Sequence, residues 1–80
     1  MTTSNNVAVL ARLAREDVNI FNVHIEGDNM VVEYEYGWNP SEYKTKWTKA
    51  VYMIDRSASL SEALMHVLTE VKMIKEELDQ

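Results

Sequence analysis

The sequence predicts a two-layer α+β protein in the order helix, three strands, helix, with a three-stranded antiparallel meander and both helices packed on one face of the sheet. Apolar residues recur at helical spacing near both ends of the chain, whereas from Val18 onward they alternate with polar ones at the period of a strand. Turn-forming residues then divide this middle stretch into strands. Eighty residues suffice for one hydrophobic core, so we expect a single domain covering residues 1–80.

The first helix is expected from Ser4 to about Glu16, with Ser4 or Asn5 as its N-cap. Its predicted apolar stripe consists of Val7, Leu10, Ala11 and Ala14, with Leu13 beside it. Because the stripe is rich in alanine, the helix should lie close to the sheet and bury little area of its own.

The first two strands are expected to form a tight hairpin. Gly27-Asp28, or Asp28-Asn29, can supply the positive φ angles that such turns require. Setting Ile25 opposite Met30 produces a row of apolar cross-strand pairs. The further pairs of that row are Val23 with Val32 and Phe21 with Tyr34.

The second hairpin is expected to turn at Gly37-Trp38-Asn39-Pro40, between two strands of opposite charge. Cross-strand charge pairing predicts the register, with Glu35 opposite Lys44 and Glu33 opposite Lys46. On the other face this register pairs Tyr36 with Tyr43 and Val32 with Trp47. Lys49 then falls on the core side, so we expect a bulge between Thr48 and Ala50.

This register assigns the strand residues to two faces. The predicted core face holds Phe21, Val23, Ile25, Val32, Tyr34 and Trp47. The predicted open face holds Asn22, His24, Glu33, Glu35, Lys44 and Lys46.

The last helix should begin after Ser59, which forms a capping-box pattern with Glu62, and run nearly to the C-terminus. Its apolar stripe is Leu60, Leu64, Val67, Val71, Ile74 and Leu78, widened by Leu68. Met65 and Met73 lie off the stripe and should be partly exposed. The heptad-like spacing also permits a homodimer through this helix, but we favour packing on the sheet, which otherwise lacks a cover.

Composition limits the classes of function. Thirteen acidic and eight basic residues give a net charge of −5, which repels nucleic acid and anionic membranes and favours a protein partner with a basic surface. The chain has no cysteine, no signal-peptide pattern at its start and no long apolar segment, so we expect a soluble cytoplasmic protein without membrane contact.

No motif for catalysis, metal or cofactor binding is present. Ser57, Ser59 and Ser61 lack a nucleophile turn, and helix capping accounts for them. His24 and His66, without cysteine or HExxH spacing, do not form a ligand set. Glu33 and Glu35 are expected to be neutralised by the facing lysines. The sequence therefore predicts a protein that is not an enzyme and has no cofactor.

The function that fits these features best is that of a small acidic binding or inhibitory protein. In size, acidity and lack of catalytic motifs, the chain is similar to many small virus-encoded inhibitors of host defence, including anti-CRISPR proteins; this likeness is one of composition and covers no motif. Such an inhibitor would occupy a basic nucleic-acid-binding site as a nucleic-acid mimic. The alternative is a homo-oligomeric structural or accessory subunit associating through the C-terminal helix.

The residues expected to contact a partner are Trp38, at the predicted hairpin apex, and six acids. The acids are Glu26, Asp28, Glu33, Glu35, Glu70 and Glu77. Met65 and Met73 are the expected oligomer contacts. Double-stranded RNA-binding domains share the predicted element order, but they have a lysine-rich start to their second helix, where this chain has Ser57-Ala58-Ser59-Leu60-Ser61-Glu62. The similarity is one of topology, and RNA binding is disfavoured.

Overall fold

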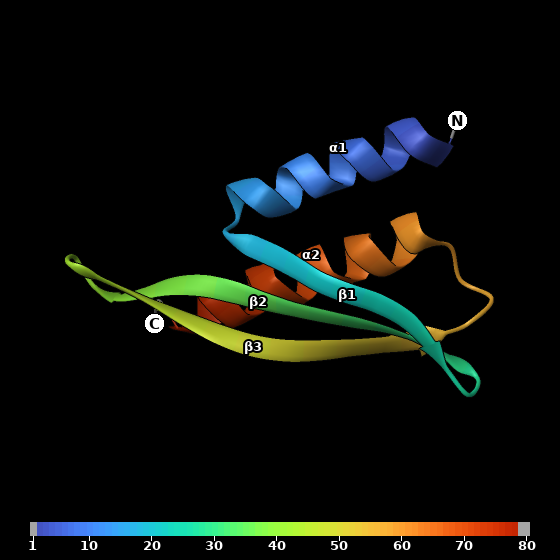
Figure 1. Ribbon diagram of the computed structural model, residues 1–80. Helices are drawn as coiled ribbons and strands as arrows, with labels where there is room; N and C mark the ends of the chain where they lie inside the picture. The colour runs from blue at the N-terminus through green and yellow to red at the C-terminus, as the bar shows by residue number, and fades with distance from the viewer. Residues whose placement is uncertain (1, 79–80) are drawn as a thin grey trace.

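The computed structural model describes residues 2–78, and the side chains of residues 6–78. The elements are α1 (Thr2–Arg15), β1 (Val18–Glu26), β2 (Asn29–Ser41), β3 (Lys44–Asp55) and α2 (Leu60–Leu78) (Figure 1). The three strands form one antiparallel sheet in the order β1-β2-β3. The predicted α+β fold and the order of its elements are thus confirmed. Within residues 2–78, no helix is long and apolar enough to cross a membrane.

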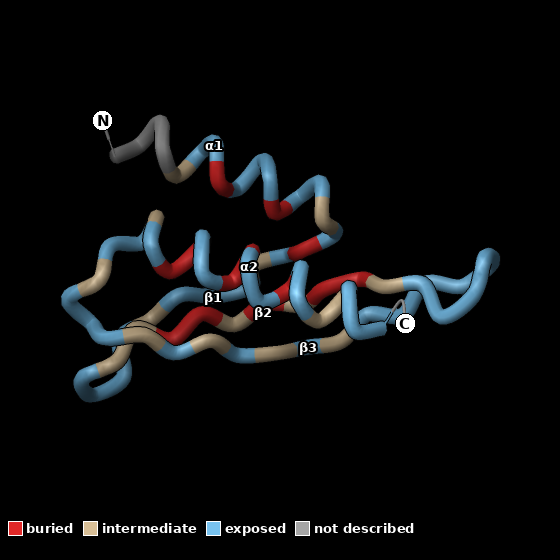
Figure 2. The backbone as a smooth tube through the Cα atoms, turned by 180° about the vertical axis from the view of Figure 1, so that it is seen from behind, coloured by how far each residue is buried: buried red, intermediate tan, exposed pale blue. Residues whose placement is uncertain are grey.

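Both helices lie on the same side of the sheet (Figures 1 and 2). α2 packs on β2 and β3, and α1 packs on α2 and on β1. The core therefore lies between α2 and the central strand, where Val32, Leu64, Val67 and Val71 are almost fully buried. β3 has no buried residue. No helix of the described residues covers the opposite side of the sheet, which we call the open face.

α1 is anchored by Val9 and by Leu13, which was expected beside the predicted stripe, and not by the stripe itself. Val9 and Leu13 are buried, whereas Val7 and Leu10, from the predicted stripe, are exposed. The prediction was wrong because it aligned the stripe on Ala11 and Ala14, which are also exposed. α1 also begins at Thr2, so Ser4 and Asn5 lie inside the helix and are not its N-cap.

The β1–β2 hairpin confirms most of the predicted register. Ile25 pairs with Met30 and Val23 with Val32 across a two-residue turn, where Gly27 has a φ of 62°. The prediction fails at Phe21, because a bulge between Ile20 and Asn22 leaves Phe21 unpaired and places Ile20 opposite Tyr34.

The predicted register of the β2–β3 hairpin is wrong. Glu35 pairs with Lys49, five positions beyond the expected Lys44, and Glu33 pairs with Val51. Because five is an odd number, the side chains of β3 exchange faces relative to the prediction. The pairing is regular from Asn29–Asp55 to Trp38–Lys46, so the bulge expected between Thr48 and Ala50 is absent there.

β2 continues through the segment that was predicted to turn. The irregularity of the ladder lies between Trp38 and Ser41, and the turn follows at Glu42-Tyr43, where Tyr43 is 92% exposed. Pro40 is tolerated because the ladder between β1 and β2 ends at the Val18–Tyr36 pair, so the missing N–H of Pro40 leaves no β1 partner unsatisfied.

Several predicted core residues are consequently exposed. Val32 and Tyr34 are buried as expected, but Phe21, Val23, Ile25 and Trp47 are not. Val23 and Ile25 share the helix-covered side with their partners Val32 and Met30, but they lie on an edge strand, and α1 packs more on α2 than on β1. Phe21 and Trp47 instead lie on the open face.

α2 matches its prediction at the N-cap and along the centre of its stripe, but Leu60 and Leu78, at the two ends of the predicted stripe, are exposed. The Ser59 hydroxyl accepts a hydrogen bond from the Glu62 amide at 3.1 Å, as expected of an N-cap. The buried residues of α2 are Ala63, Leu64, Val67, Leu68 and Val71. Met65 and Met73 are exposed, as predicted.

Candidate functional site

The open face is the candidate functional site, because polar and large apolar side chains are exposed there together. The register places Asn22, His24, Glu33 and Glu35 on this face, as predicted. Lys49, Val51 and Met53 of β3 join them, since they pair with Glu35, Glu33 and Val31. Lys46 was expected here but pairs with Trp38, so it belongs to the side that faces the helices. Lys44 pairs with Ser41 beyond the irregularity, so it does not face Glu35.

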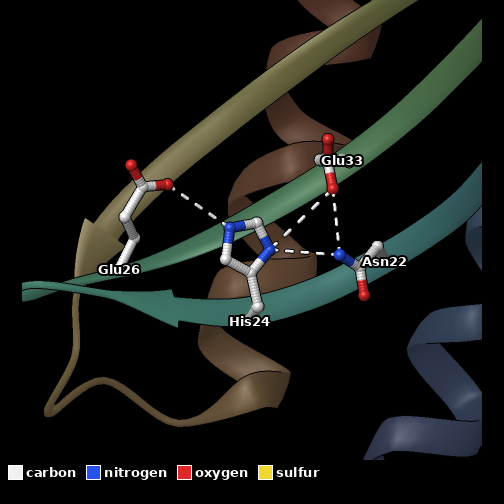
Figure 3. A network of polar contacts seen from close by, with 4 residues as sticks. All are labelled: Asn22, His24, Glu26 and Glu33. Carbon is white, nitrogen blue, oxygen red and sulfur yellow. Dashed lines mark hydrogen bonds and ion pairs between the residues drawn. The ribbon is translucent and has the colours of Figure 1, made fainter.

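A polar network centred on His24 occupies one end of the open face (Figure 3). His24 Nε2 lies 3.4 Å from Glu26 Oε2, and His24 Nδ1 lies 3.8 Å from Glu33 Oε2. The Asn22 amide donates to Glu33 Oε2 at 3.0 Å and lies 3.1 Å from His24 Nδ1. β1 supplies three of these residues and β2 supplies Glu33, so the hairpin register assembles the network.

The geometry of this network does not suit a metal ion. The two carboxylates approach opposite nitrogens of the imidazole ring, whereas a metal ion binds one nitrogen and needs its other ligands gathered on that side. Among the described residues, no group of three His, Cys, Asp or Glu side chains is arranged to hold a metal. The network orients His24 and holds two carboxylates at the surface.

Apolar side chains form the second component of the open face. Phe21, Trp47, Val51 and Met53 are each about half exposed. Phe21 lies on this face because of its bulge, and Lys49 Nζ lies 5.7 Å from the centre of its ring. A shallow cavity of about 260 Å³ extends over all three strands. It is lined by Phe21, Glu33, Tyr34, Lys49, Ala50 and Val51.

Trp47 lies over Gly37, its cross-strand partner. A Cβ atom added at Gly37 would lie 3.1 to 3.2 Å from three carbons of the Trp47 ring. The absent side chain at position 37 therefore lets the indole lie flat on the strand, where any larger residue would lift it. This contact holds half of the Trp47 side chain against the sheet and leaves the other half exposed.

Trp38 is not at the hairpin apex. It lies within β2 on the side that faces the helices, is packed against the core, and donates a hydrogen bond from Nε1 to the Thr48 hydroxyl at 3.2 Å. It borders a small cavity of about 150 Å³ together with Asp17, Asn39 and Lys75. The prediction that Trp38 is an aromatic at a loop tip is therefore wrong, because the strand extends past it.

The predicted acids lie in both layers of the protein. Glu26, Glu33 and Glu35 lie on the open face, where Glu35 accepts a hydrogen bond from Asn19 at 3.2 Å. Asp28 is exposed in the β1–β2 turn. Glu70 and Glu77 project from α2 in the other layer, together with Met65 and Met73. The structure thus brings three of the six acids together, next to the apolar residues of the open face.

Tyr34, on the helix-covered side of the sheet, and Asp55, at the end of β3, have shifted pKa values. Burial raises the pKa of Tyr34 above 10.0, and the nearby Glu70 carboxylate adds to the shift. Hydrogen bonds from the Ser57 hydroxyl and amide, at 2.6 and 2.8 Å, lower the pKa of Asp55 below 3.8. Both shifts follow from local packing and hydrogen bonding, and neither indicates a proton-transfer site.

The fold and this face define a small α+β protein whose open antiparallel sheet exposes apolar and acidic groups side by side. The chain matches no protein-family model, no curated protein and no solved structure. The physical properties of the open face are therefore the basis for inferring its role.

Proposed function

We propose that the protein is a non-enzymatic binding module whose open face attaches to a basic surface of a partner protein. The observation that supports this proposal is the exposure of Phe21, Trp47 and Met53 beside Glu33 and Glu35 on a side of the sheet without a helix. Partly exposed aromatic and methionine side chains are typical sources of binding energy, and the carboxylates around them select a partner of opposite charge.

In a more specific form of this proposal, the basic surface of the partner is a nucleic-acid-binding site, which the protein occupies as an inhibitor. The net charge of −5 and the acids Glu26, Glu33 and Glu35 on the open face support this form. Glu70 and Glu77 would not take part in the same contact, because they lie in the other layer. The composition is that expected of virus-encoded counter-defence proteins.

Affinity capture with matched variants tests the proposal. Protein immobilised through its C-terminus is incubated with lysate of the source cell, and the Phe21→Ser and Met53→Ser variants are compared with wild type. Met73→Ser is the control, because Met53 and Met73 are 56% and 55% exposed but lie in different layers. We expect a specific partner that the open-face variants lose and the control retains. Each lost anchor should reduce the affinity about tenfold, which corresponds to about 1.4 kcal/mol.

Salt and competition experiments test the role of charge. Raising the salt concentration should weaken capture, and Glu35→Gln should weaken it more than Glu77→Gln does. If the basic surface of the partner is a nucleic-acid-binding site, duplex or single-stranded nucleic acid should also displace the protein from its partner. A partner held equally well by Phe21→Ser, or lost equally with Met73→Ser, would contradict the use of the open face.

Association through the stripe of α2 is less well supported. Leu64, Val67 and Val71 of that stripe are buried against the sheet, so a helix-to-helix contact would have to use the exposed Met65 and Met73 instead. A monomeric mass that is unchanged by Met65→Glu or Met73→Glu in light scattering would exclude this alternative.

A further inference from the structure

The outer edge of β3 is an unpaired strand edge. Within the described residues, β3 pairs only with β2, and it has no buried residue along its twelve positions. Figure 1 shows it as the outermost strand, with no helix or loop along its free side. A free edge carries unpaired backbone N–H and C=O groups that can accept another strand, and many proteins protect such edges with charged residues.

The protection of this edge is uneven. Lys44, Lys46 and Lys49 place charges on the half of the strand near the Glu42-Tyr43 turn. The next five residues, Ala50 to Ile54, carry no charge and include three residue types that favour strands. This uncharged run is bounded by Lys49 at one end and Asp55 at the other.

We infer that β3 pairs in antiparallel fashion with β3 of a second copy, with the two-fold axis at Tyr52. The opposite charges at the two ends of the uncharged run make the segment complementary to itself. The cross-strand pairs are Lys49 with Asp55, Ala50 with Ile54, Val51 with Met53, and Tyr52 with its own counterpart. Every apolar residue of the run then faces an apolar partner, and each dimer gains two ion pairs.

Neighbouring registers lose this match. When two copies of β3 pair in one continuous sheet, side chains that lie opposite each other must be on the same face of the sheet. The two-fold axis can therefore move only from one residue of the strand to the next. Centring the pair on Val51 sets Lys49 opposite Met53 and Asp55 opposite Trp47. Centring it on Met53 sets Val51 opposite Asp55 and Ala50 opposite Arg56. Both alternatives place charged side chains against apolar ones.

The existing contacts of the two charged residues are compatible with the pairing. Asp55 uses Oδ1 for its hydrogen bonds with Ser57, which leaves Oδ2 for Lys49 of the second copy. Lys49 would exchange its contact over the Phe21 ring, which is weak at an exposed site, for the ion pair. The pairing produces a six-stranded sheet with all helices on one side. The pairing uses the edge of the sheet and does not depend on the function proposed above.

Sedimentation equilibrium with charge variants tests the association. Wild type should show a concentration-dependent dimer, and Lys49→Glu should raise its dissociation constant at least about tenfold, because two cross-strand ion pairs become like-charge pairs. Lys44→Glu makes the same change in charge outside the paired segment and should leave the dissociation constant unchanged within about twofold.

Disulfide trapping tests the register, and the chain has no cysteine to interfere. Val51 and Met53 are both more than half exposed, so cysteine at either position should leave the core intact. A mixture of Val51→Cys and Met53→Cys proteins should form the mixed disulfide, because these positions face each other, whereas each variant alone should cross-link far more slowly. A monomer at all concentrations up to about 1 mM, an equal effect of Lys44→Glu, or equal cross-linking of Val51→Cys alone would overturn the inference.

Discussion

Truncating Leu13 should destabilise the protein severely, because this residue anchors α1. Leu13 is 1% exposed, whereas Leu10 on the same helix is 45% exposed. Leu13→Ala and Leu10→Ala remove the same atoms and change helix propensity by the same small amount, so the difference between them measures packing alone. The pair therefore tests which face of α1 contacts the core.

The expected magnitude follows from the burial of Leu13. Replacing a fully buried leucine with alanine costs about 3 to 5 kcal/mol, and we expect about 3 kcal/mol here because α1 covers only one side of the core. A chain of eighty residues has a total unfolding free energy of about 4 to 12 kcal/mol. The Tm should fall by roughly 12 to 24 °C, at about 4 to 8 °C for each kcal/mol in a domain of this size. Leu10→Ala should cost less than about 1 kcal/mol, because nearly half of its side chain is already in water.

Urea denaturation followed by far-UV circular dichroism measures both values, provided that the m-value stays constant. A Leu10→Ala variant as unstable as Leu13→Ala would refute the reasoning. It would show that α1 packs through the stripe Val7, Leu10, Ala11 and Ala14, rotated from the face that the structure buries.

Three further predictions concern single interactions. Ser59→Ala should cost about 1 kcal/mol in a urea melt, because α2 loses its N-cap, and Ser59→Asp should retain most of that stability; equal losses would contradict the cap. Folding raises the pKa of Tyr34. The contribution of Tyr34 to the free energy of unfolding is therefore complete below pH 10.0 and is lost as the pH rises through the pKa of the folded state. Tyr34→Phe should therefore flatten the fall in stability at alkaline pH, and an unchanged slope would contradict this assignment. Since folding lowers the pKa of Asp55, its contribution is present above pH 3.8 and is lost as the pH falls through the folded pKa. Ser57→Ala removes the hydroxyl hydrogen bond and keeps that of the amide, so the Asp55 pKa should move part of the way back toward 3.8 in a carboxyl NMR titration; no movement would show that the hydroxyl bond is not a cause.

Local patterns in the sequence predicted much of the fold. The Ser59 cap and the central apolar positions of α2 could be identified because capping and helical periodicity depend on residues a few positions apart. The Gly27-Asp28 turn and the pairs next to it could be identified for the same reason. The order of the elements follows from these local patterns.

The register of the second hairpin could not be derived from its charges. A cross-strand ion pair contributes only about 0.2 to 1 kcal/mol, so matching Glu35 with a lysine does not select one register among several. In the structure, Gly37 of β2 lies beneath the indole of Trp47. The prediction did not consider this pair, because it assigned Gly37 to the turn. The residues that β3 contributes to the candidate site were missed for this reason, because an odd shift of β3 exchanges its faces.

The bulge at Phe21 is a second feature that the prediction missed. No glycine or proline marks it, but the adjacent apolar residues Ile20 and Phe21 interrupt the alternation of apolar and polar residues at this point. Of the site residues, sequence reasoning identified Glu26, Glu33 and Glu35 but assigned Phe21 and Trp47 to the core. Recognising an open apolar face requires the tertiary contacts that decide which side the helices cover.

The two tryptophans lie at the same level of the β2–β3 ladder on opposite sides of the sheet. Trp38 pairs with Lys46 on the helix side, and Trp47 pairs with Gly37 on the open face. Intrinsic tryptophan fluorescence therefore reports on one end of one hairpin, whereas circular dichroism reports on the whole chain. Coincidence of the two unfolding curves would show that this end of the hairpin unfolds in the same cooperative transition as the core, and separate midpoints would reveal that it frays first.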